Sequence, residues 1–437
     1  MDAKSRIVAD AATRAGRYRW KICALLFAAT AINYIDRQMI GVLKPVLQSD
    51  LGWTEAQYAD VIFWFQAAYA LGFLVVGRFI DRVGARIGYA VAFSFWTLAH
   101  MAHGLVGSVV QFTIVRFALG LGESGNFPSG LKAVAEWFPQ RERALAVGLF
   151  NAGANVGAIA TPLIVPAITL AYGWRMAFIA TGLLSILWLV AWVTIYRRPH
   201  EHQRVGAAEL ALIQSDPVQP AGHMPWLRLF AVRETWAYAI PKFLTDPIWW
   251  MFLFWLPDFL GKRHGLDLKS FGIPLVIIYL LSDGGSVLGG WASSRLLRAG
   301  WSANAARKTI MLASAIAVLP IVTVQYVDQL WLAVALIGLA TAGHQAFSAN
   351  LLTLPSDLFP RQAVASIVGI GGTAGALGGM MIAKFVGHML SLSGSYAPIF
   401  AVAGGAYLLA LAALHIISPR LAPARFAPAA PLISHGE

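Results

Sequence analysis

Charged residues are scarce in this sequence. Asp, Glu, Lys and Arg make up 12% of its 437 residues, whereas 58% are hydrophobic and the mean hydropathy is +0.64. Soluble globular proteins carry about 25% charged residues. The composition therefore excludes an ordinary soluble domain and indicates a chain embedded in a lipid bilayer.

Cysteine and acidic residues are also few. The single cysteine, Cys23, excludes an internal disulfide and a thiolate metal cluster. The 21 acidic residues face 33 basic ones, giving a net charge of +12. Because the basic residues are spread over short loops, they indicate orientation in a membrane rather than binding to nucleic acid. No group of His, Glu and Cys has the spacing of metal ligands or of a nucleophile and its base, so we expect no metal, no cofactor and no enzymatic activity.

Long apolar segments predict an all-α membrane protein with twelve transmembrane helices in two six-helix, pseudo-symmetric bundles. The expected spans are 20–46, 58–79, 86–106, 109–137, 144–168, 174–196, 236–260, 271–294, 308–326, 330–355, 363–390 and 396–417. The expected organisation is a cytoplasmic N-tail (1–19), an N-terminal bundle (20–197), a cytoplasmic linker (198–235), a C-terminal bundle (236–418) and a cytoplasmic C-tail (419–437). Lys and Arg gather in the loops on the side of the two tails, which predicts cytoplasmic termini.

Two charged residues, Asp36 and Arg37, lie well inside the first apolar segment. Each charge at mid-bilayer costs about 3 kcal/mol on insertion scales, so such residues are expected to face a protein interior or a wet cavity. The Arg37 guanidinium can hold a carboxylate through two parallel hydrogen bonds. The alternative is that Arg37 only neutralises Asp36 or Glu123.

The fourth span carries a second pair of charges. Arg116 and Glu123 are seven residues apart and therefore share one helix face. With Asp36 and Arg37 they make a set of two positive and two negative charges. An incoming carboxylate would upset this balance, and protonation of Asp36 or Glu123 would restore it. We expect these two acids to carry protons and Arg116 to release one of them, the alternative being two permanent salt bridges.

A similar sequence pattern occurs once in each half of the chain. Two such repeats that meet near the bilayer midplane are typical of transporters. The first copy, Gly77-Arg-Phe-Ile-Asp81-Arg82-Val-Gly84-Ala-Arg86, follows the second span. The second, Gly290-Trp-Ala-Ser-Ser294-Arg295-Leu-Leu-Arg298, follows the eighth.

Five motifs resemble those of a known family. Gly77-xxx-Asp81-Arg82-x-Gly84-x-Arg86 resembles the loop motif of the major facilitator superfamily. Three segments resemble motifs of the anion:cation symporter family within this superfamily: Asn33-Tyr34-Ile35-Asp36-Arg37, Arg116-Phe-Ala-Leu-Gly120-Leu-Gly122-Glu123 and Trp137-Phe-Pro139-x-x-Glu142-Arg143. The hexuronate transporter branch is resembled by Lys242-Phe-Leu-Thr-Asp246-Pro-Ile-Trp249-Trp250.

The resemblance implies a major facilitator fold and a proton-coupled symporter that imports a sugar-acid anion by alternating access. The implied substrate is a hexuronate, galacturonate or glucuronate. Another organic anion, such as galactonate, glucarate or an aromatic acid, stays open as the alternative. The implied partners are the anion, protons as the coupling ion and the lipid bilayer of the cell inner membrane, with the chain acting as a monomer.

Residues from both halves are expected to bind the anion: Tyr34, Arg37, Tyr69, Asn155, Trp249, Trp250, Gln345 and Asn350. For Tyr69 and Asn155, helix packing is the alternative. Lys242 is expected to extend toward an aqueous end of its helix rather than to bind substrate. The roles of Asp246 and Asp283 stay open, and His344 is expected either to transfer protons or to make a structural hydrogen bond.

A separate gating role is expected at the ends of the second and third spans. Asp81, Arg82 and Arg86 resemble the charged lock that joins the two halves in the outward-open state, and Arg143 is expected to be a gating residue next to them.

Overall fold

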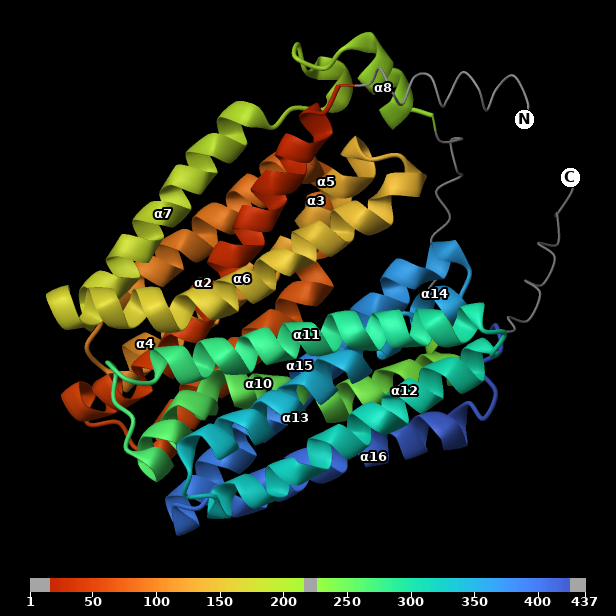
Figure 1. The fold of residues 1–437 in the computed structure, drawn as a ribbon. Coiled ribbons are helices and arrows are strands. Elements are labelled where there is room, and N and C mark those ends of the chain that lie inside the picture. Colours follow the sequence, from red (N-terminus) through yellow and green to blue (C-terminus); the bar gives the residue numbers. More distant parts are fainter. Residues whose placement is uncertain (1–15, 216–225, 425–437) are drawn as a thin grey trace, which may run out of the picture.

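The computed structural model describes residues 16–215 and 226–424, and within these ranges its regular elements are helices. Figure 1 shows one group of helices from the first half of the chain, coloured red to yellow-green, beside a second group coloured green to blue. The expected all-α fold with twelve spans in two six-helix bundles is confirmed for these ranges. Residues 1–15, 216–225 and 425–437, from the expected tails and linker, lie outside the described residues.

The helices of the first bundle are α2 (Tyr18–Leu51), α3 (Glu55–Ala102), α4 (Val109–Glu123), α5 (Asn126–Trp137), α6 (Gln140–Tyr172) and α7 (Trp174–Ile195), with the short turn η1 (His103–Leu105) after α3. Two expected spans are joined in α3. This run bends at Gly84, whose φ of 84° and ψ of 163° leave the helical region. Such a φ favours glycine, which has no Cβ to clash. The segment 77–86, expected as a loop, is helical on both sides of this bend.

The span expected at 109–137 is interrupted directly after Glu123. The turn of Ser124 and Gly125 separates α4 from α5. The Ser124 hydroxyl donates to the Leu121 carbonyl over 2.7 Å, a local bond of the kind that competes with regular helix. On α3, the missing side chain of Gly72 leaves the space that the Ser124 side chain occupies.

Short elements connect the two bundles: η2 (Pro199–Glu201), α8 (Ala207–Ile213) and α9 (Trp226–Phe230). α8 is tied to the start of α2, since Glu209 accepts from the Arg19 amide over 3.0 Å and lies 3.2 Å from its guanidinium. Arg19 also pairs with Glu142 of α6 at 2.8 Å.

The helices of the second bundle are α10 (Arg233–His264), α11 (Gly272–Arg298), α12 (Ala303–Val318), α13 (Leu330–Leu351), α14 (Leu354–Leu358), α15 (Arg361–Ser393) and α16 (Ala397–Ile417), with η3 (Leu319–Tyr326) extending α12. Counting both bundles, eight segments of the described chain are long and apolar enough to cross a membrane by length and composition. α2 and α10 are not among them, although they have 34 and 32 residues. Both carry several charged residues, and these charges build the site described below.

Small residues bring the helices close together. A Cβ at Gly153 or Gly157 of α6 would overlap backbone atoms of α2, and the same holds for Gly285 of α11 against α13. Close approach through small residues is how helices gain packing energy in a membrane, where burial from water contributes little. Between the bundles, α2 packs on α10, α3 on α15 and α6 on α11.

Gly157→Val should destabilise the protein. Its branched side chain would meet the Ala31 carbonyl and the Tyr34 Cβ on α2, and overpacking of this kind costs about 1–3 kcal/mol. We expect a lower melting temperature for the purified protein in detergent. Gly148→Val is the matched control, because a Cβ at Gly148 of the same helix has nothing within 4 Å. Equal melting temperatures for the two variants would contradict this account of the α2–α6 contact.

Candidate functional site

An arginine and a glutamate meet in the protein interior, brought together by α2 and α4. Arg37 Nε donates to Glu123 Oε2 over 2.8 Å, and Arg37 Nη2 lies 2.8 Å from the same oxygen. The two side chains are 3% and 0% exposed. The pair therefore faces neither lipid nor open water, and the neutralising contact between Arg37 and Glu123, one of the two alternatives above, is present.

Aromatic rings from both bundles surround the Arg37 guanidinium. We call this group of rings the Arg37 enclosure: Tyr34, Phe65, Tyr69 and Trp250. Its carbon atom lies 4.7 Å from the ring centre of Tyr69, 5.2 Å from Tyr34 and 5.1 Å from Trp250. Phe65 lies at 5.7 Å. A cation over an aromatic face is stabilised by the charge distribution of the ring. The structure thus brings four of the predicted binding residues, Tyr34, Arg37, Tyr69 and Trp250, to one place between the halves.

Asp36 points to a different partner from that of Arg37. Asp36 is fully buried, and its Oδ1 lies 3.2 Å from His100 Nε2, which in turn lies 2.8 Å from the hydroxyl of Thr181. His100 was not among the site residues predicted from the sequence. The available signal was a titratable residue inside an apolar span, which is costly unless it has a partner or a function.

Arg116 binds the backbone of α2 rather than a carboxylate. Its Nη2 donates to the Arg37 carbonyl over 2.6 Å and its Nη1 to the Asp36 carbonyl over 3.5 Å. Its guanidinium lies 4.5 Å from the ring centre of Phe65. Arg116 therefore holds the α2 segment that carries both charged residues, and its expected role in releasing an acid stays a prediction.

In the second bundle, Trp249 stacks on His344. Their ring centres are 5.2 Å apart with planes 5° from parallel, and His344 Nδ1 lies 2.6 Å from the Tyr407 hydroxyl. This is the hydrogen-bonded alternative considered for His344. The bundles are joined nearby by Gln38, whose side-chain amide donates to the Tyr279 hydroxyl over 2.5 Å.

Three other predicted binding residues are Asn350, Gln345 and Asn155. Asn350 donates to the carbonyls of Ala346 at 2.9 Å and Gly289 at 3.3 Å, so its amide ties α13 to α11. Gln345 on α13 and Asn155 on α6 are half-buried. Binding roles for all three stay predictions, and Asn350 also has a packing role between α11 and α13.

Lys242 pairs with Asp246 one turn further along α10, with 2.5 Å between Nζ and Oδ2. The two side chains are 12% and 18% exposed. The expectation that Lys242 extends toward an aqueous end is therefore wrong, because the ion pair keeps its ammonium group inside the bundle.

Two of the expected gating residues, Arg86 and Arg143, donate to backbone carbonyls of their own bundle. Arg86 donates to the Val193 carbonyl over 3.1 Å, and Arg143 donates to the carbonyls of Phe138 at 2.9 Å and Ala135 at 3.2 Å. Arg82 is exposed. The side chain of Asp81 lies outside the described residues, and a lock between the halves stays a prediction.

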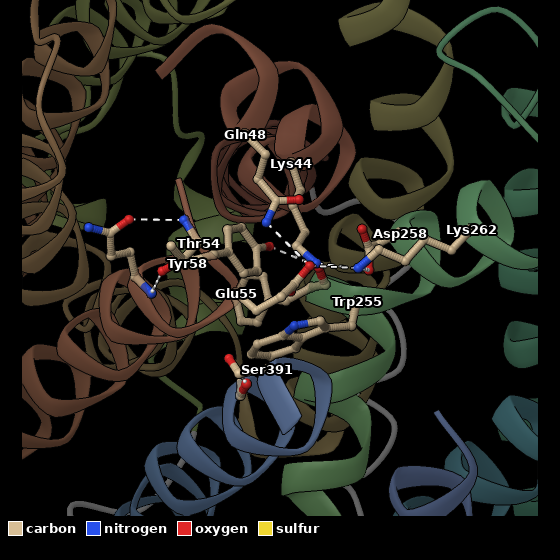
Figure 2. Close-up of polar contacts among 12 residues, drawn as sticks. Lys44, Gln48, Thr54, Glu55, Tyr58, Trp255, Asp258, Lys262 and Ser391 are labelled. Atoms are coloured by element: carbon tan, nitrogen blue, oxygen red, sulfur yellow. Dashed lines mark hydrogen bonds and ion pairs between the residues drawn. The ribbon is translucent and has the colours of Figure 1, made fainter. Parts of the chain in front are cut away.

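Four charged residues fasten the bundles together beyond the site, at the end of α2 that precedes α3. We call them the four-charge cluster: Lys44, Glu55, Asp258 and Lys262. Figure 2 shows them facing one another, with one cation and one anion from each bundle. Lys44 Nζ lies 2.8 Å from both Glu55 and Asp258, and Lys262 Nζ lies 2.6 Å from Glu55 and 3.0 Å from Asp258.

Hydrogen bonds extend the four-charge cluster. The Tyr396 hydroxyl donates to Asp258 over 2.5 Å, and the Tyr58 hydroxyl donates to the Phe254 carbonyl over 2.8 Å. The Lys44 side chain is fully buried. These contacts join α2 and α3 to α10. They were not predictable from the sequence, because they depend on the distance between helices of different halves.

Comparison with known proteins identifies the family. The model of the Major Facilitator Superfamily matches residues 26–383. The chain belongs to this superfamily. It is thus a membrane transporter and not an enzyme, as the sequence predicted.

Among the relatives of this Major Facilitator Superfamily member, the hexuronate transporter of Escherichia coli K12 is 33% identical over 391 residues, covering 88% of this chain and 90% of the relative. The galacturonate transporter of Dickeya chrysanthemi is 34% identical over 279 residues, covering 62% of this chain and 81% of the relative. These matches confirm the resemblance to the hexuronate transporter branch.

A solved structure agrees in fold. The crystal structure of a D-xylose-proton symporter superposes with a TM-score of 0.74 at 16% sequence identity, covering 93% of this chain and 98% of the other. At this identity the likeness establishes the architecture of the superfamily and carries no information on the substrate.

Proposed function

We propose that this transporter is a proton-coupled symporter that imports a hexuronate, such as galacturonate or glucuronate, by alternating access. The observation that carries the proposal is the buried Arg37–Glu123 pair inside a ring of aromatic side chains. An arginine fork matches a carboxylate, and aromatic faces suit the apolar side of a sugar ring. The names of the two relatives support the same substrate class.

Coupling follows from competition for one guanidinium. Glu123 occupies the Arg37 side chain at 2.8 Å, so a substrate carboxylate has to displace it. A displaced, ionised Glu123 would be a buried charge without a partner, and breaking a buried pair in this way costs about 3–5 kcal/mol. Protonation of Glu123 removes that cost. Anion binding and proton uptake thereby become one event.

Asp36 is the second proposed proton carrier. Arg116 positions the segment of α2 that carries Asp36. The contact with His100 gives Asp36 a partner that can itself bind a proton. The remaining proposed contacts with the anion come from Tyr34, Tyr69, Asn155, Trp249, Trp250 and Gln345. No cofactor is required in this scheme, because the proton is the coupling ion.

The proposed setting is the cell inner membrane, with a monomeric chain and both termini in the cytoplasm. The excess of basic residues in the loops on the side of the tails supports this orientation. The proposed halves are residues 20–197 and 236–418, joined by the linker 198–235. In this orientation the four-charge cluster is the outer gate, and Asp81, Arg82, Arg86 and Arg143 lock the inner end when the outer gate opens.

Uptake by purified protein in proteoliposomes tests the function. We expect a pH gradient, acidic outside, to drive accumulation of labelled galacturonate above the external concentration, and dissipation of the gradient to abolish it. Accumulation that is insensitive to the gradient would contradict proton coupling, and uptake of galactonate in preference to galacturonate would contradict the hexuronate assignment.

Glu123→Gln should separate coupling from binding. The amide keeps the size of the side chain but cannot release a proton, so gradient-driven accumulation should fall at least about tenfold, a change of 1.4 kcal/mol in coupling free energy. Exchange of internal for external galacturonate should persist, because Arg37 remains. Glu201→Gln is the matched control, since Glu201 is about half exposed in the linker. Unaltered accumulation in Glu123→Gln would exclude the proton role.

Lys44→Met should loosen the proposed outer gate. It leaves Glu55 and Asp258 sharing Lys262 alone, and removing one partner from a buried ionic cluster costs about 3–5 kcal/mol. Spin labels on cysteines at Gly107 and Lys269, one exposed loop residue in each half, should then report longer distances, with Cys23 replaced by Ser in all samples. Lys21→Met, a change at an exposed lysine, is the control. An unchanged distance distribution would show that the cluster does not hold the gate.

A further inference from the structure

We propose that Lys242 and Asp246 form a hydroxyl-binding subsite that selects sugar acids with one carboxylate over those with two. The inference rests on the proposed function, because it concerns the end of the anion remote from Arg37. It assigns a specificity role to a pair that the sequence analysis left without one.

Neighbouring residues on α10 connect the subsite to the Arg37 enclosure. Tyr238, Lys242, Asp246 and Trp250 follow one another at intervals of four residues, so each lies beside the next along α10. Trp250 lies against the Arg37 guanidinium at 5.1 Å. Asp246 lies one turn from Trp250, ~6 Å along the axis at 1.5 Å per residue. An anion whose carboxylate binds Arg37 would thus present its other end to Asp246 and Lys242.

The pair is less deeply buried than the charges at Arg37. The Lys242 and Asp246 side chains are 12% and 18% exposed, whereas those of Arg37 and Glu123 are 3% and 0% exposed. The absence of a side chain at Gly375 of α15 leaves the space that the Asp246 carboxylate occupies, since a Cβ there would overlap Oδ2. In this proposal a ligand hydroxyl contacts the part of the pair that stays exposed.

Two tyrosines complete the surroundings. Tyr34 lines the Arg37 enclosure, with its ring centre 5.2 Å from the guanidinium carbon. The Tyr238 hydroxyl, one turn before Lys242, is buried and has no hydrogen-bond partner among the described residues. A buried polar group without a partner costs free energy unless a ligand or water satisfies it, so this hydroxyl points to a polar occupant.

Charge decides which occupant fits. At 2.5 Å the lysine and aspartate neutralise each other, and together they offer donors and acceptors that match sugar hydroxyls. A second carboxylate at this position would lie beside the Asp246 carboxylate and be repelled. A neutral, hydroxylated end is therefore favoured, as in a uronate, over the second carboxylate of an aldarate. The simpler alternative is an ion pair one turn apart that only stabilises its own helix.

Asp246→Asn tests the inference because it leaves the lysine charge without its partner. The assay measures how strongly galactarate and unlabelled galacturonate each inhibit uptake of labelled galacturonate in proteoliposomes. We expect the ratio of the first inhibition to the second to rise roughly tenfold, because one hydrogen bond to a charged group has an energy of about that size. Asp328→Asn is the matched control, since Asp328 is exposed at the protein surface. A ratio equal to that of the wild-type protein would show that the pair is structural only.

The double variant Lys242→Met/Asp246→Asn covers the case in which the single variant does not fold. It leaves no unpaired charge, and it should weaken galacturonate binding roughly tenfold, as measured by the concentration needed for a thermal shift in detergent, without a gain for galactarate. Unchanged binding of galacturonate would overturn the inference. Absence of sugar-acid uptake by the wild-type protein would instead overturn the proposed function, so the two failures are distinguishable.

Discussion

The contact between Arg37 and Glu123 is the constraint from which most of the structure follows. Both side chains lie in the interior of a helical bundle that is embedded in lipid, where neither charge can be left without a partner. The aromatic enclosure of Tyr34, Tyr69 and Trp250 stabilises the cation without supplying a second negative charge. The acid beside the guanidinium therefore balances the site when no anion is bound. In the proposed mechanism, an incoming anion takes the place of that charge, and a proton removes it.

The four-charge cluster obeys the same rule at one end of the molecule. Lys44 is fully buried, yet the cluster as a whole is neutral because each bundle contributes one cation and one anion. Opening this contact divides the cluster into two halves that are themselves neutral, Lys44 with Glu55 and Lys262 with Asp258. Neither bundle then retains a net buried charge. A gate built in this way can hold two bundles together and still separate at moderate cost, because each lysine keeps one acid.

The sequence predicted the charges of the site better than their partners. Asp36, Arg37 and Glu123 were identifiable because a charge within an apolar segment is costly, and the aromatic residues near Arg37 followed from the family resemblance. The contacts of His100 with Asp36 and of Asp258 with Lys44 were not predictable, since each joins residues that are far apart in the sequence. The break after Glu123 was missed for a local reason, a serine side chain that bonds to the backbone and fits against Gly72. Asn350 has the residue type of a ligand, but its amide is taken up by two carbonyls.

In the proposed mechanism the two bundles make different contacts with the anion. In this mechanism the first bundle recognises the charge of the anion, because it provides the Arg37 guanidinium, the two acids and the α2 segment held by Arg116. The second bundle provides Trp250 and the Lys242–Asp246 pair on α10, which are the proposed contacts with the sugar ring and its hydroxyl groups. If one bundle held both functions, an anion could bind without drawing the halves together. Because the contacts are divided, a ligand has to span both bundles to satisfy both sets, and its binding energy becomes available to the movement of one bundle relative to the other.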